Sequence, residues 1–403
     1  ISNQNVINMN YILFAVINIM LLIFLISKNK SLFLKYILVI LLALIILFPK
    51  ESIDSAKEGI NLWIFVLAPS LLPFFIINDI LVSLNLPADI SYALSGITEF
   101  LFNTSGYGAY TFILSIFTGY PTAAKIVSEL YESNKIDKQE GQKILTFSST
   151  SGPLFIIGTV GVGMLNSPTA GYILYLSHIF GAILNGLFHR NFKKTNYNND
   201  KCDNHNTNNI SFGKTFSEAI KNSFITLGFI GGYVIIFSVI IGLLNCIGYF
   251  SILSSLLQLI FKFNFKTGNT ISAVIQSLLE ITNGCNIISK LDISFFVKMI
   301  IISFIIGFSG LSIIGQFISI LYNTKISINK YIISKLTQGV FSSICCFLIL
   351  KYINGTIESF NNIYKNTYFN KYYSILILIE ILLMLIFILL LFVKSKQNRH
   401  PPA

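Results

Sequence analysis

Long runs of apolar residues constrain the fold of this chain more than any other feature of its sequence. Only 11% of its 403 residues are charged, whereas soluble domains average about 25%, so the charges are too few to cover a water-exposed surface. In hydrocarbon every backbone N–H and C=O must be paired within the protein, which favours helices. We therefore predict an all-α polytopic membrane protein. The runs that approach the roughly 20 residues needed to cross a bilayer are Tyr11–Ser27, Leu32–Phe48, Tyr172–Phe188, Gly232–Ile247, Leu336–Leu350 and Tyr372–Val393.

The net charge of +11 is distributed as in a membrane protein, not as in a nucleic-acid-binding protein. Basic residues cluster just beyond the apolar runs, which is the positive-inside pattern, so the predicted partner is the lipid bilayer and no nucleic acid. The five cysteines show no CxxC spacing, and we predict no metal site and no cofactor. The clusters comprise Lys28, Lys30 and Lys35, then Arg190, Lys193, Lys194 and Lys201, then Lys325, Lys330 and Lys335, and finally Lys394, Lys396 and Arg399.

A polar linker rich in Asn, Lys and Asp, Asn191–Ile210, separates two halves that resemble each other. Three segments match in the same order at a nearly constant offset, which argues for a duplication. They are Ser55–Leu67 with Glu218–Ile230, Ala124–Leu130 with Cys285–Leu291, and Ser151–Ile156 with Ser309–Ile314. The predicted organisation is an N-terminal transmembrane hairpin (1–49), a first repeat (50–190), a polar cytoplasmic linker (191–211), a second repeat (212–353), and a C-terminal transmembrane helix with a basic tail (354–403).

The charges outside the spans predict that the two repeats are inverted copies. If Lys28–Lys35 is cytoplasmic, the next span runs outward and the first repeat begins outside the membrane. The linker Arg190–Lys201 is basic and therefore inside, so the second repeat begins inside. Inverted repeats are typical of secondary transporters, whose solute site lies near the membrane midplane where the copies meet.

Gly, Ser and Pro interrupt apolar segments in both halves, at Pro69–Pro73, Thr118–Pro121, Ser151–Pro153, Glu280–Gly284 and Gly307–Ser312. A proline breaks a helix interior but suits the first turn of a new helix. Unpaired peptide groups persist in a membrane only where they line a cavity, and the N-terminus of a half-helix attracts anions. The predicted substrate-binding residues are Thr118, Gly119, Tyr120, Pro121, Lys125, Ser149, Thr150, Ser151, Gly152, Thr282, Asn283, Gly284, Ser309, Gly310, Ser312 and Gln316.

Ionisable residues at membrane depth are costly and are functional by default. Asp79 and Glu280 are the predicted coupling groups, and Glu280 is the best candidate for a proton- or cation-linked group. Lys125, one turn into a predicted half-helix, would add a full positive charge to the site. His178 is expected to hydrogen-bond inside the bundle, and Trp63 to anchor an amphipathic helix at the membrane interface.

These motifs together resemble those of the YlbJ-type sporulation integral membrane proteins of the wider Gate (nucleoside-recognition) family. The resemblance covers about residues 50–350, and the chain departs from the pattern at Asp79, Thr118, Ala123 and Ser149–Thr150. It implies a core like that of concentrative nucleoside transporters. It also implies a role in spore maturation, thought to be movement of dipicolinic acid across the outer forespore membrane. The motifs are Trp63, Pro69–Phe75, Gly119–Pro121 with Lys125, Ser151–Gly161, Glu280–Gly284, and Gly310–Ser312 with Gln316.

The predicted function is therefore a membrane permease of sporulation for a small anionic solute, dipicolinic acid first of all, and not an enzyme. Within the same class, a nucleoside or another small solute is the alternative cargo. A divalent metal is disfavoured, because the residues at the breaks include few metal ligands. From another class, the alternative is a membrane morphogenesis protein that transports nothing. The coupling ion, the direction of transport and the formation of a homo-oligomer stay open.

Overall fold

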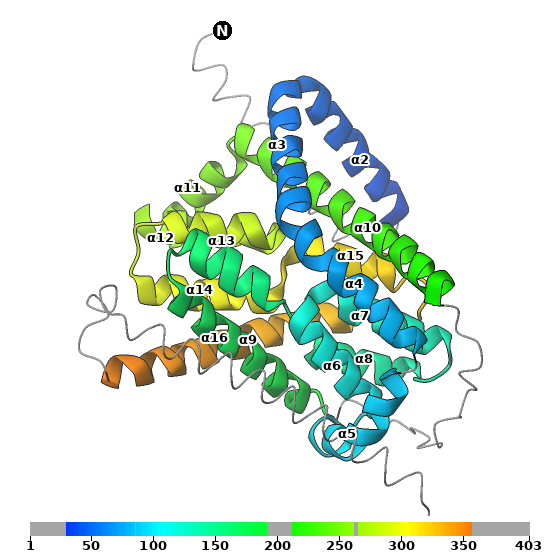
Figure 1. Ribbon diagram of the computed structural model, residues 1–403. Coiled ribbons are helices and arrows are strands. Elements are labelled where there is room, and N and C mark those ends of the chain that lie inside the picture. The colour runs from blue at the N-terminus through cyan, green and yellow to red at the C-terminus, as the bar shows by residue number, and fades with distance from the viewer. Residues whose placement is uncertain (1–29, 85, 192–211, 262–264, 357–403) are drawn as a thin grey trace, which may run out of the picture.

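The computed structural model describes residues 30–84, 86–191, 212–261 and 265–356, and its regular elements there are all helices (Figure 1). The run Tyr11–Ser27 of the predicted N-terminal hairpin, nearly all of the linker, and the C-terminal helix Tyr372–Val393 with its basic tail lie outside the described residues. The first described half contains α2 (Lys30–Leu47), α3 (Pro49–Leu62), the π-helical turn η1 (Trp63–Leu67), α4 (Ala68–Ser83), α5 (Leu86–Phe102), α6 (Tyr107–Thr118), α7 (Tyr120–Glu132), α8 (Lys138–Ser148), η2 (Leu154–Met164) and α9 (Pro168–Phe188). The second contains α10 (Phe212–Cys246), α11 (Tyr249–Phe261), α12 (Phe265–Leu279), α13 (Ile281–Lys290), α14 (Phe295–Phe308), α15 (Gly310–Ile320) and α16 (Ile328–Thr356).

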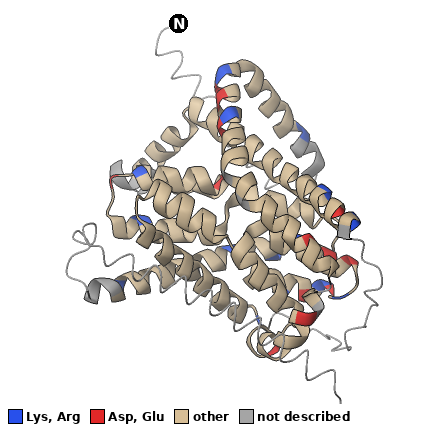
Figure 2. Cartoon of the chain, viewed as in Figure 1, with Lys and Arg blue, Asp and Glu red and all other residues tan. Residues whose placement is uncertain are grey.

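Four stretches of helix in the described ranges are long and apolar enough to cross a membrane: α9, α10, α14 continued by α15, and α16. A further pair, α2 and α3, passes the same test together but bends by 104° between Leu47 and Pro49. Figure 2 shows long uncharged stretches on the helices that cross the middle of the molecule. The all-α membrane class predicted from the apolar runs is confirmed.

The same order of elements occurs twice along the chain. A hairpin of two short helices (α6 and α7, then α12 and α13) is followed by an interrupted helix (α8 with η2, then α14 with α15) and by one long span (α9, then α16). Contacts between the halves come in equivalent pairs. Helix α7 of the first half packs on α15 of the second, as α13 of the second packs on η2 of the first. The equivalent helices α9 and α16 pack on each other, and so do α3 and α10. This repeated order is the pattern expected of two related copies. The domain boundaries and the opposite orientation of the copies across the bilayer stay predictions.

Trp63 of η1 packs against α10, where the first half of the chain crosses that helix. Its indole Nε1 donates to the Leu227 carbonyl oxygen (3.0 Å), and its ring fills the space above Gly231, where an added Cβ would lie 2.4 Å from the indole. The expectation that Trp63 anchors a helix at the membrane interface stays a prediction. Its N–H group finds its partner on a neighbouring helix, which a pattern of local amphipathicity does not reveal.

Gly231→Ala is expected to lower the melting temperature of the detergent-solubilised protein, because the new methyl group displaces the Trp63 ring. Gly232→Ala is the matched control, since a Cβ there meets nothing within 4 Å and alanine favours a helix over glycine by roughly 1 kcal/mol. Equal melting temperatures for the two variants would contradict this account of the crossing.

The predicted helix break at Pro69–Pro73 does not occur. Helix α4 continues through Pro73, and the irregularity lies earlier, in the π-helical turn η1, where the Ala68 N–H donates to the Trp63 carbonyl. One wide turn accommodates the proline-rich segment without ending the helix.

Candidate functional site

In the first half, the break between α6 and α7 lies against the break between α8 and η2. Gly119 ends α6 with φ of +102°, a conformation that glycine adopts readily and other residues rarely do. A Cβ on Gly119 would lie 3.3 Å from the Gly152 nitrogen, and one on Gly152 would lie 3.1 Å from the Phe117 carbonyl oxygen. Pro121 falls in the first turn of α7, as predicted. The two interruptions therefore contact each other directly.

The second half repeats this contact. Ser309 and Gly310, between α14 and α15, both have positive φ, of 74° and 81°. A Cβ on Gly310 would lie 3.4 Å from the Ile281 nitrogen and 3.5 Å from the carbonyl oxygens of Leu278 and Leu279, which flank the break between α12 and α13. Each half thus brings two interrupted segments together.

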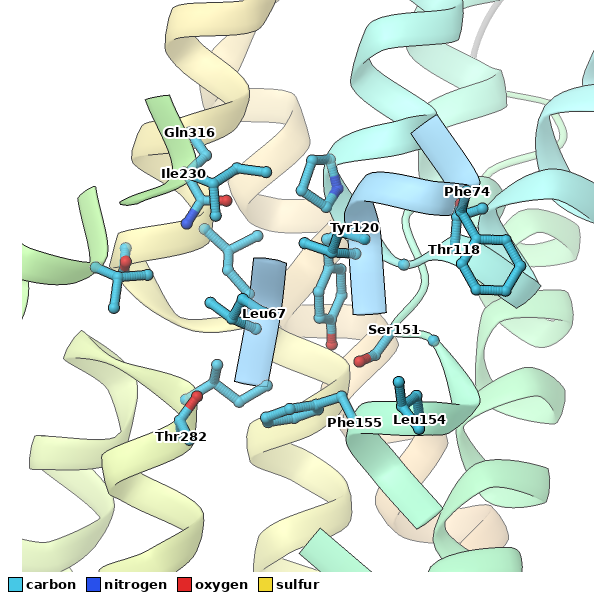
Figure 3. A pocket seen from close by; sticks show the side chains of 18 of the residues that line it. Leu67, Phe74, Thr118, Tyr120, Ser151, Leu154, Phe155, Ile230, Thr282 and Gln316 are labelled. Carbon is cyan, nitrogen blue, oxygen red and sulfur yellow. The ribbon is translucent and has the colours of Figure 1, made fainter. Parts of the chain in front are cut away.

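All four interruptions border one cavity, and Figure 3 shows Tyr120, Ser151, Thr282 and Gln316 around it. The space that no atom fills is about 680 Å³, part of it open to the surroundings, which is in the range of small-molecule sites. Residues on the list predicted from sequence that line it are Thr118, Gly119, Tyr120, Pro121, Ser151, Gly152, Glu280, Thr282, Ser312 and Gln316. Ser309 and Gly310 form the adjacent turn.

An apolar wall completes the cavity, and sequence reasoning missed it. Leu67, Leu71 and Phe74 come from η1 and α4, and Ile230 and Val234 come from α10. The match between Ser55–Leu67 and Glu218–Ile230 pointed to these elements without indicating that they reach the cavity. The other apolar lining residues, Phe117, Leu154, Phe155, Ile281 and Ile313, flank the interruptions themselves.

Three helices begin at the cavity with no side chain capping their N-terminus: α7, η2 and α15. The first N–H groups of a helix have no partner within it and carry a partial positive charge. The hydroxyl of Ser312, buried in the first turn of α15, also has no hydrogen-bond partner in the described part of the chain. The cavity therefore borders helix N-termini without a side-chain cap in both halves, together with one unpartnered hydroxyl.

The fourth helix, α13, differs because Glu280 caps it. The carboxylate oxygens of this buried residue accept from the N–H groups of Thr282 (3.0 Å) and Asn283 (2.7 Å). The expectation that Thr282 and Asn283 hold an anion at this N-terminus needs correction, because Glu280 already occupies it. Gly284 lies within the same hairpin, and a Cβ there would be 2.4 Å from Ser277.

Lys125 does not present a free charge to the cavity, contrary to the prediction. Its ammonium group forms an ion pair with Asp79 and lies 5.9 Å from the centroid of the Phe75 ring. Both charged side chains are buried, with about a tenth of each exposed, and neither residue lines the cavity. Asp79, predicted as a coupling group, thus neutralises Lys125.

Ser149 and Thr150 also turn away from the cavity. The Ser149 hydroxyl pairs with the hydroxyl of Tyr331 on α16 (2.8 Å), and the Thr150 hydroxyl donates to Ser115 Oγ (3.3 Å). His178 of α9 accepts from the Ser151 N–H through Nε2 (2.9 Å), so its expected role as an internal hydrogen-bonding residue is confirmed.

The position of Lys335 differs from the prediction, which placed it with Lys325 and Lys330 in a cytoplasmic basic cluster. The structure places it inside the protein with 0% of its surface exposed. Its ammonium group donates to the Ser149 carbonyl oxygen (2.9 Å) and to Gln338 Oε1 (2.6 Å). Because Lys335 follows two other lysines closely in the sequence, the sequence did not indicate that it is buried and hydrogen-bonded inside the protein.

Interrupted helices that meet around one cavity define a polytopic α-helical membrane protein with re-entrant segments. The chain is 29% identical over 343 residues to the sporulation integral membrane protein YlbJ of Bacillus subtilis (strain 168), an alignment that covers 81% of this chain and 84% of that protein. This similarity supports the resemblance to the YlbJ-type sporulation integral membrane proteins that the motifs indicated. No family model matches the chain. A solved structure of CNTnw in an outward-facing state aligns with a TM-score of 0.46 and 14% identity, covering 87% of this chain and 100% of that one.

Proposed function

We propose that this protein is a permease of sporulation that moves a small anionic solute, dipicolinic acid first of all, across the outer forespore membrane. It acts by binding and release, not by catalysis. The observation that carries the proposal is the set of donors at the cavity, namely three helix N-termini without a side-chain cap and the unpartnered hydroxyl of Ser312. Such donors suit carboxylate groups.

The apolar wall supports an aromatic solute. Dipicolinate carries two carboxylates on one flat ring, so it needs donors for its charged edge and apolar contacts for its faces. Leu67, Leu71 and Phe74 supply the apolar contacts from one side of the cavity, and Phe155 adds a second aromatic ring. The donors of α7 and α15 border the same cavity.

Uptake of labelled dipicolinate into proteoliposomes tests the proposal. The wild-type protein is expected to fill vesicles with label well above empty vesicles. Ser312→Ala is expected to reduce the initial rate roughly tenfold, because a hydrogen bond to a charged group contributes about 1.5–3 kcal/mol. Ser251→Ala is the matched control, since that serine is exposed and its hydroxyl donates to the carbonyl of Gly248, the residue before α11.

Two results would overturn the proposal and separate its alternatives. Uptake of nucleoside but not of dipicolinate would place the protein among nucleoside permeases. Vesicles containing folded protein that accumulate neither solute would favour a morphogenesis protein without a transport role.

A further inference from the structure

Lys335 is a buried lysine without a carboxylate partner. It lies on α16 within a stretch long and apolar enough to span a membrane, and it has 0% exposure. In the described part of the chain, the ion pairs join Lys57 to Asp54 and Lys125 to Asp79, and neither includes Lys335. A lone charge at such a position is costly and marks a functional site by default.

The surroundings of Lys335 require a donor but not a charge. Its nitrogen donates to the Ser149 carbonyl oxygen (2.9 Å) and to Gln338 Oε1 (2.6 Å), and it lies 5.0 Å from the centroid of the Tyr120 ring. An uncharged side chain with N–H groups could satisfy both oxygens. The desolvation cost of an ammonium group therefore needs a further explanation.

The cavity supplies that explanation, because Lys335 lies directly behind its wall. Tyr120, whose ring faces the ammonium group, lines the cavity. Ser149, which accepts from the ammonium group, is two residues before the lining residue Ser151. The charge is thus separated from the cavity by one side chain and one short backbone segment.

We propose that Lys335 supplies the positive charge through which the cavity selects an anionic solute, an inference that rests on the proposed transport of an anion. Asp79 neutralises Lys125, and the N–H groups of α13 hold the carboxylate of Glu280. Lys335 has no such compensation in the described residues, so burial disfavours its ammonium form and a carboxylate that arrives nearby favours it. In a water-poor site its field acts over several ångströms with little screening, so an arriving carboxylate gains attraction that an uncharged analogue does not.

Binding to the purified full-length protein in detergent, measured by titration calorimetry, tests this role. The probes are dipicolinate, isophthalate as a second aromatic dianion, and the uncharged diamide of dipicolinic acid. Lys335→Gln keeps an N–H donor for the Ser149 carbonyl but removes the charge. It is expected to weaken dianion binding at least tenfold and to leave diamide binding within about twofold of wild type.

Two matched variants separate charge from structure. Lys335→Arg keeps the charge and is expected to retain most of the preference for dianions. Lys351→Gln removes a charge from an exposed position on the same helix and is expected to bind like wild type. A folded Lys335→Gln protein that prefers dianions as strongly as wild type would overturn the proposal.

The wild-type protein provides a second test that does not depend on the folding of a variant. Equal affinity for the diamide and for both dianions would overturn the role of Lys335, whatever the substrate is. Preference for isophthalate over the diamide without binding of dipicolinate would refute the proposed substrate and leave the role of Lys335 supported.

Discussion

Lys125→Met is expected to lower the free energy of unfolding by about 3–5 kcal/mol, because it leaves the carboxylate of Asp79 buried without its partner. The ion pair is nearly enclosed, so water cannot replace the lost contact. The double variant Asp79→Asn with Lys125→Met removes both charges and is expected to recover much of the loss. Chemical unfolding in detergent, followed by tryptophan fluorescence or circular dichroism, measures the three proteins against wild type.

The exposed pair of Lys57 and Asp54 provides a control within the same chain. Their side chains are 68% and 57% exposed with the charged atoms 3.7 Å apart, and exposed pairs of this kind contribute at most about 1 kcal/mol. Lys57→Met should therefore change stability little. If Lys125→Met were as stable as Lys57→Met, the ion pair would not be the structural element described here. Transport by the double variant would show in addition that Lys125 is not needed to bind the solute.

Gly119→Ala is expected to abolish transport and to destabilise the protein by about 1–3 kcal/mol, because its backbone conformation is one that alanine rarely adopts. The φ of +102° ends α6 and aims α7 at the cavity. A methyl group there would also press on the Gly152 nitrogen at 3.3 Å. Melting temperature and dipicolinate uptake in proteoliposomes measure the two effects.

Gly158→Ala is the matched control for Gly119→Ala. Gly158 lies in η2 of the same half, and a Cβ there would meet only Leu154 Cδ1 at an ordinary 3.7 Å. This variant is expected to fold and transport like wild type. Wild-type uptake by Gly119→Ala would mean that the interruption between α6 and α7 has no part in the function.

Local sequence signals predicted the spans in the described part of the chain, and most of the interruptions, correctly. Apolar runs identify membrane helices because hydrocarbon leaves the backbone no partner but itself. The Gly119–Pro121 motif identifies a break because glycine permits the positive φ and proline suits the turn that follows. Of the predicted substrate-binding residues, Pro121, Ser151 and Thr282 line one cavity, and Ser309 forms the turn beside it.

Charged residues were predicted less well, because their role depends on partners far away in the sequence. Lys125 contacts Asp79 across 46 positions, and Lys335 contacts the Ser149 carbonyl across 186. Neither spacing carries a periodic signal. The sequence therefore could not distinguish a free charge from a neutralised one, or a loop lysine from a buried one.

By itself, the sequence determined that this chain is a helical membrane protein with two similar halves and several interrupted segments, since those properties follow from hydropathy and backbone chemistry over a few residues. Only the tertiary structure decided which helix N-termini stay uncapped, which lysine lies behind the cavity and which is neutralised. Those features depend on side chains that meet when the two halves pack together, and on which buried groups find a partner in a medium without water.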